Sequence, residues 1–164
     1  MPHKTPILMV TLVMFCAGGA SAQDLCFQYT TSGGGVFVAK GQTLPAANGC
    51  KPFNAAEKMV RGDIGSVIGG LTGTLCADRF ASRYVFHYSS HSCGYSFSKE
   101  GTSYFESGFC MFKGRPSPDG VIGSCRGTVV TAHPTKPIEG AGFLLDAKLS
   151  TCNEALNEFP CPPP

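Results

Sequence analysis

Cysteine residues recur at long intervals along the chain, and this pattern constrains the fold more than any other feature. The set comprises Cys26, Cys50, Cys76, Cys93, Cys110, Cys125, Cys152 and Cys161. An even number of widely spaced cysteines is typical of a disulfide framework in an exported domain. Structural zinc needs closely spaced pairs such as Cys-x2-Cys, and the sequence contains none. We therefore expect a disulfide-stabilised domain in which these eight cysteines form four bridges.

The first 22 residues have the pattern of a secretory signal peptide. Lys4 precedes an apolar run over residues 7–17, and the small residues Ala20-Ser21-Ala22 follow it. The apolar run covers only about half of the roughly 20 residues that a membrane-spanning helix needs. We expect cleavage after Ala22, a periplasmic or secreted protein with no membrane contact after processing, and a single disulfide-rich β domain over residues 23–164.

Composition favours a β-sheet protein and argues against a polyanionic partner. The chain has 21 glycines and only 15% charged residues, which suits many turns and strands better than a helical bundle. Lys and Arg number 13 against 11 acidic residues, so removal of Lys4 leaves 12 against 11 and a net charge of +1. The basic residues are scattered singly, so neither nucleic acid nor an anionic membrane is an expected partner.

Apolar residues alternate with polar ones in several segments, which predicts strands. In residues 84–90, Tyr84, Phe86 and Tyr88 share one face of the expected strand. The other expected strands cover residues 25–30, 36–39, 71–77, 104–113, 123–131 and 142–149. They predict a mainly β domain, either a small antiparallel sandwich or a partly closed barrel of about six to eight strands.

Two short segments carry helix-capping signals. Asn54 and Glu57 have capping-box spacing, with Gly62 as a possible end, and Thr151 and Glu154 have the same spacing before Pro160. We therefore expect one or two short helices beside the strands. A glycine cluster over residues 65–73 predicts a loop or a bulged strand between them.

The expected strands 104–113 and 123–131 form a hairpin whose register can be predicted. Residues 115–120 contain Pro, Asp and Gly and predict the turn between strands 104–113 and 123–131. Cys110 and Cys125 are equally distant from the centre of this turn, so opposed residue numbers should sum to 235. Directly opposed β-carbons lie at bridging distance. This register predicts a Cys110–Cys125 disulfide, whereas 105 connectivities are possible for eight cysteines in general.

A small extracellular nuclease is one functional alternative. Such hydrolases use Glu, His and Arg on one sheet face for acid–base catalysis, and His87, Glu106 and Arg126 are the residues available here. The register argues against this site, because it places Glu106 on the face of Val129 and turns Arg126 to the other face.

A metal site is a further alternative. His87 and His91 would lie on the same face of a strand with Ser89 between them. Four residues of extended strand span about 13 Å, so one ion could bind both imidazoles only if the chain turned at Ser89-Ser90. We expect no bound metal and no cofactor.

The leading functional expectation is a noncatalytic binding or interaction module. It would bind a protein or small-molecule partner of unknown identity, act as a monomer, and use loops and exposed aromatic residues around residues 84–104. Aromatic side chains contribute much of the binding energy at such surfaces. The competing interpretation is that most of these aromatic residues form the core.

Overall fold

The protein is described here by a computed structural model, which defines residues 22–30, 36–58, 67–95, 103–133 and 135–155. Eight strands and no helix occur within these residues. The strands are β1 (Gln23–Tyr29), β2 (Val36–Gln42), β3 (Cys50–Lys58), β4 (Val67–Ala77), β5 (Arg83–Tyr95), β6 (Ser103–Lys113), β7 (Val121–His133) and β8 (Lys136–Cys152). The expectation of a mainly β, disulfide-stabilised domain is confirmed.

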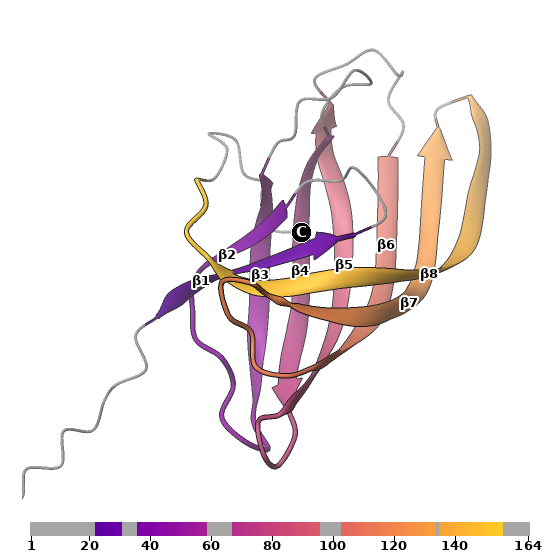
Figure 1. Ribbon diagram of the computed structural model, residues 1–164. Helices are drawn as coiled ribbons and strands as arrows, with labels where there is room; N and C mark the ends of the chain where they lie inside the picture. Colours follow the sequence, from indigo (N-terminus) through magenta and orange to yellow (C-terminus); the bar gives the residue numbers. More distant parts are fainter. Residues whose placement is uncertain (1–21, 31–35, 59–66, 96–102, 134, 156–164) are drawn as a thin grey trace, which may run out of the picture.

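The strands form one closed antiparallel barrel in sequence order. Each strand pairs with the next, and β8 returns to pair with β1 through Leu25–Thr151 and Phe27–Leu149. Figure 1 shows β1 and β8 lying side by side where the barrel closes. Of the two architectures expected from the sequence, the structure is therefore the barrel, and its closure is complete. Closure leaves no open sheet edge along this seam.

Three disulfides join neighbouring strands of the barrel. Cys26–Cys152 links β1 to β8 at the seam, Cys50–Cys76 links β3 to β4, and Cys110–Cys125 links β6 to β7. Disulfides of this kind are typical of an oxidising, extracellular compartment. The side chain of Cys93 and all of Cys161 lie outside the described residues, so the expected fourth bridge stays a prediction.

The β6–β7 hairpin has the register expected from the sequence. Cys110 pairs with Cys125 and Glu106 with Val129, so the opposed residue numbers sum to 235. The turn is closed by the Gly120 amide, which donates to the Ser117 carbonyl over 2.9 Å. Gly120 has a φ of +78°, a left-handed conformation that glycine adopts without strain. The predicted Cys110–Cys125 bridge is confirmed.

Aromatic side chains fill the barrel interior. Tyr84, Phe86 and Tyr88 share one face of β5, as the sequence predicted, and the structure directs that face inward. These three aromatic residues therefore belong to the core and not to an exposed binding surface. Phe27 of β1 is fully buried at the centre, with ring centroids 5.3 Å from Phe86 and 5.4 Å from Tyr88. The interior is thus a packed core, as expected for an eight-stranded barrel of this size.

The prediction of a short helix from Asn54 onward is wrong. Residues 54–58 belong to β3, which pairs with β2 through Phe37–Glu57 and with β4 through Asn54–Thr72. A capping box stabilises a helix end by about 1 kcal/mol, whereas pairing of residues 54–56 with β4 and of residues 56–58 with β2 gives the segment a ladder of backbone hydrogen bonds. The rest of the expected helix, residues 59–62, lies outside the described residues.

The helix expected at the C-terminal end is also not found where the structure describes the chain. Thr151 belongs to β8, which continues to Cys152 and pairs with β1. Residues 153–155 have no regular structure, and residues 156–164 lie outside the described part.

The glycine-rich segment contains a bulged strand, because the β4–β5 register shifts between Ile68 and Gly69. The sequence predicted either a loop or a bulged strand for this segment, and the described part is the bulged strand.

Candidate functional site

A row of stacked side chains crosses the outer wall of the barrel. His87 of β5 pairs in register with Phe109 of β6, and Phe109 pairs with Arg126 of β7. The His87 and Phe109 rings stack at 5.6 Å with an angle of 28°, and the Arg126 guanidinium carbon lies 4.4 Å from the centre of the Phe109 ring. We call these three residues the aromatic row. It leads into Leu144 of β8, which is 81% exposed.

A second row, two residues further along each strand, consists of short hydroxyl side chains. Its members are Thr72, Ser89, Ser107 and Thr128, paired in register from β4 to β7. We call these four residues the hydroxyl row. Neighbouring strands are about 4.8 Å apart, so the row spans about 14 Å of the outer wall.

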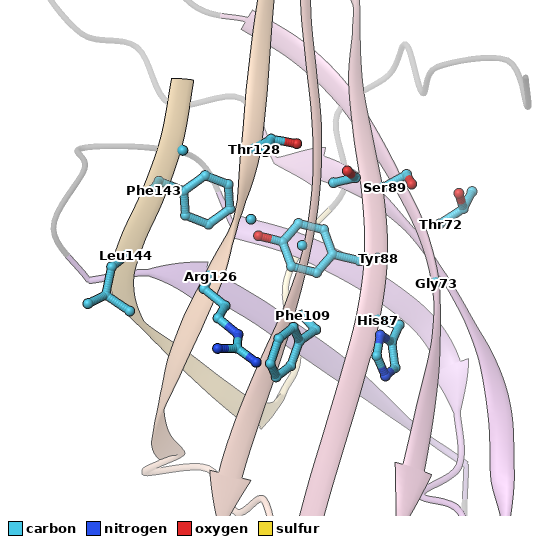
Figure 2. Close-up of a pocket in the computed structure, with 14 residues that line it drawn as sticks. Thr72, Gly73, His87, Tyr88, Ser89, Phe109, Arg126, Thr128, Phe143 and Leu144 are labelled. Atoms are coloured by element: carbon cyan, nitrogen blue, oxygen red, sulfur yellow. The ribbon is translucent and has the colours of Figure 1, made fainter. Parts of the chain in front are cut away.

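The two rows border an open groove with a volume of about 930 Å³. Figure 2 shows His87, Phe109 and Arg126 in one row, with Ser89 and Thr128 in the other and Tyr88 and Phe143 between them. The groove has a floor because the residues between the rows point toward the barrel interior and leave only backbone on the outside.

Glycine is required on the floor of the groove. A β-carbon at Gly127 would lie 2.1 Å from the Ser107 carbonyl oxygen, and one at Gly73 would lie 2.2 Å from that of His87. Both distances are far inside van der Waals contact with the backbone of the next strand. Glycine therefore lets adjacent strands approach and curve here, as glycines at barrel bends commonly do.

A second hollow of about 400 Å³ adjoins the other side of the hydroxyl row. It is lined by the same four hydroxyl residues and by Ser90, His91, Phe105, Glu106 and Val130. Phe105 is 51% exposed, which is unusual for a phenylalanine on a small soluble domain. The hydroxyl row therefore runs between two surfaces that each contain a histidine and a phenylalanine.

Glu106 is directed away from the groove by two tyrosines. Its Oε1 accepts a hydrogen bond of 2.6 Å from the Tyr88 hydroxyl and a short one from the Tyr29 hydroxyl. The two tyrosine oxygens are themselves 3.0 Å apart. Burial, reinforced by the Glu106 hydrogen bond, raises the pKa of Tyr88, and burial together with the nearby Tyr88 and Glu106 raises the pKa of Tyr29.

This cluster should make the fold sensitive to alkali. Above about pH 10 the unfolded chain releases phenolic protons that the folded chain retains, so the free energy of unfolding falls as pH rises. We expect the Tyr29→Phe/Tyr88→Phe variant to lose less stability than the wild type between pH 8 and pH 11, with a pH slope that is smaller by about two protons only at the upper end of this range. Urea unfolding at each pH measures this slope. The pH 8 value of each protein serves as its reference. An equal loss of unfolding free energy in the two proteins would contradict the prediction.

The structure does not bring the three catalytic candidates together. His87 and Arg126 lie on the outer wall with the Phe109 ring between them. Glu106 faces inward and is held by Tyr29 and Tyr88. The register predicted that Glu106 and Arg126 lie on different faces of the sheet, and the structure confirms this: Arg126 is exposed on the outer wall and Glu106 faces the interior. These three residues therefore do not form an acid–base pair that faces the groove.

The two histidines named as possible metal ligands are held apart. β5 is continuous from Arg83 to Tyr95, so the turn at Ser89-Ser90 that would bring His87 and His91 together is not present. Within the described residues, no group of three or more His, Cys, Asp or Glu side chains could hold an ion.

None of the described residues forms a helix that is long and apolar enough to cross a bilayer.

Sequence reasoning missed Phe109 and the whole hydroxyl row. Phe109 was not among the candidate site residues, although a register summing to 235 already sets it opposite Arg126. The hydroxyl row gave no signal, because Thr72, Ser89, Ser107 and Thr128 form a row only when the registers of three hairpins are known. Serine and threonine in strands are otherwise unremarkable.

No family model, curated protein or solved structure matches the chain. The geometry of the outer wall therefore carries the functional proposal.

Proposed function

We propose that the protein is an exported, noncatalytic binding module that holds its ligand in the groove between the aromatic row and the hydroxyl row. The observation that carries this proposal is a groove of about 930 Å³ with a stacked aromatic and a cation on one side and an array of hydroxyls on the other. Binding sites commonly combine apolar contact area with a few polar groups that fix orientation.

Three further features support a binding role. The chain begins with a segment that has signal-peptide character, and the described disulfides fit an oxidising destination such as the periplasm or the extracellular space. The groove lies on paired strands of a closed barrel, so its side chains are held at fixed spacing before a ligand arrives. Such preorganisation lowers the entropy cost of binding.

A fragment screen tests the location of the site. We expect small polar aromatic and sugar-like fragments to shift the amide resonances of Ser107, Phe109 and Arg126 in the ¹⁵N-labelled, disulfide-intact protein. The Ser107→Phe variant fills the groove and should abolish these shifts. The matched control is Gln28→Phe, which adds the same side chain on β1, away from the lining residues.

The outcome is decisive in both directions. Fragments that bind only elsewhere, or that bind the Ser107→Phe variant as well as they bind the wild type, would contradict the proposed site. Circular dichroism and thermal unfolding of both variants show whether each retains the barrel. A hydrolase would in addition turn over a substrate, and that turnover would depend on His87.

A further inference from the structure

The chemistry of the groove indicates the class of ligand. Arg126 provides the permanent positive charge among the residues that line the groove, and none of these lining residues is acidic. Its guanidinium carbon lies over the Phe109 ring, 4.4 Å from the ring centre, so the ring shields one side of the group. The planar group keeps its N–H donors at its edge, where they match the two oxygens of a carboxylate or sulfate.

The charge of Arg126 is not neutralised in the described part of the chain. Its neighbour on β6 is Phe109, and the ion pair found in that part joins Lys40 to Asp24, far from the groove in sequence and strand order. Asp146 on β8 is the closest acidic residue in the register, opposite Ser124, and lies beyond ion-pairing distance of Arg126.

The barrel also directs the carboxylate of Glu106 away from the groove. Glu106 directly precedes Ser107 of the hydroxyl row and pairs in register with Ser90 and Val129. Its side chain turns inward and accepts hydrogen bonds from Tyr29 and Tyr88. The groove thus keeps a cation next to an array of neutral hydroxyls. A ligand with one anionic group and several hydroxyls of its own complements this pattern.

The hydroxyl row indicates the chemistry of the uncharged part of the ligand. Each serine or threonine hydroxyl can donate one hydrogen bond and accept two, so four of them at about 4.8 Å intervals can pair with a polyhydroxylated chain. The second hollow continues this surface past Phe105, which lies four residues from Phe109 on the same strand. Four residues of strand separate the exposed Phe105 ring from the half-buried Phe109 ring by about 13 Å.

We propose that the groove binds an acidic glycan, with Arg126 on a carboxylate or sulfate group, Phe109 against a sugar ring, and the hydroxyl row on the sugar hydroxyls. This inference rests on the proposed function, because it assigns a ligand to the same groove. Nucleic acid is disfavoured, because a single arginine cannot follow a phosphate backbone and the chain carries little net charge.

Titration with defined oligosaccharides tests the ligand class. The probes are oligogalacturonate for the carboxylate, dextran sulfate oligomers for the sulfate, unmodified dextran oligomers as the neutral reference, and a single-stranded oligonucleotide. We expect one of the two acidic glycans to bind at least about tenfold more tightly than the neutral oligomer, with an affinity that falls as salt rises. The better of the two identifies the anionic group.

A matched pair of variants tests the role of Arg126. Arg126→Gln should weaken acidic-glycan binding by about tenfold or more, as expected for the loss of a charge-assisted hydrogen bond. Arg79→Gln is the control, because Arg79 is likewise stacked on an exposed phenylalanine, with its guanidinium carbon 4.5 Å from the Phe80 ring, but lies outside the groove. It should leave the affinity unchanged. Both arginines are exposed, and thermal unfolding confirms that both variants fold.

The results separate this inference from the proposed function. If neutral glycans or fragments bind in the groove and Arg126→Gln leaves their affinity unchanged, the acidic-glycan assignment is wrong and the binding module stands. Tighter binding of the oligonucleotide than of either acidic glycan would also overturn the assignment. If no probe or fragment shifts the groove resonances, both proposals fail.

Discussion

Removal of the Cys26–Cys152 disulfide is expected to lower the free energy of unfolding by about 4 to 5 kcal/mol. The bridge joins residues 126 positions apart, so in the unfolded chain it closes a loop that includes almost the whole domain. Long closed loops restrict the unfolded ensemble most strongly. The bridge also lies on the β1–β8 seam, where the barrel closes. Typical domains have a net stability of only 5–15 kcal/mol, so this loss is large.

The experiment compares two paired alanine substitutions by urea unfolding. Cys26→Ala/Cys152→Ala removes the seam bridge, and Cys50→Ala/Cys76→Ala removes a bridge that spans only 26 positions. The second loss should be about 3 to 4 kcal/mol, hence smaller than the first. If the short-loop variant were the less stable of the two, the seam bridge would not have the dominant role assigned to it.

Phe27→Ala is expected to destabilise the barrel by about 3 to 5 kcal/mol. The Phe27 side chain is 0% exposed, and its ring lies 5.1 Å from Tyr29, 5.3 Å from Phe86 and 5.4 Å from Tyr88. Alanine would leave a cavity among these aromatic side chains and remove the edge-to-face contacts of Tyr29 and Phe86 and the tilted contact of Tyr88 with Phe27. Because Tyr29 and Tyr88 also hold Glu106, the substitution should loosen that cluster as well.

The control for this substitution is Phe80→Ala. Phe80 lies in the turn between β4 and β5 and is 70% exposed, so its loss should change the free energy of unfolding by no more than about 0.5 kcal/mol. Chemical denaturation of both variants with the disulfides intact measures the difference. Similar losses at the two positions would contradict the assignment of Phe27 to the centre of the core.

The hairpins illustrate how far local sequence signals extend. The alternation at Tyr84, Phe86 and Tyr88, and the equal distances of Cys110 and Cys125 from their turn, both depend on residues close together in the chain. Side-chain alternation and turn chemistry are short-range effects, so strands β4 to β7 could be predicted. The register of β6 and β7 followed from the same information, including the outward placement of Arg126.

The segment after Asn54 shows where local signals fail. Its capping spacing is compatible with a helix, yet β2 and β4 recruit it into the sheet on both sides. That choice depends on strands that come earlier and later in the chain, and no local pattern encodes their positions. Tertiary pairing commonly overrides a weak local preference in this way.

The sequence by itself determined the class of the protein: an alternating, glycine-rich, disulfide-stabilised β domain with a defined β6–β7 register. Only the tertiary structure decided that β8 closes on β1, that Glu106 turns inward to Tyr29 and Tyr88, and that His87 stacks on Phe109. The physical reason is that each of these contacts joins different strands, and their spacing depends on the registers of several hairpins at once. Alternation fixes which face a side chain occupies, but only the closed barrel fixes its neighbours.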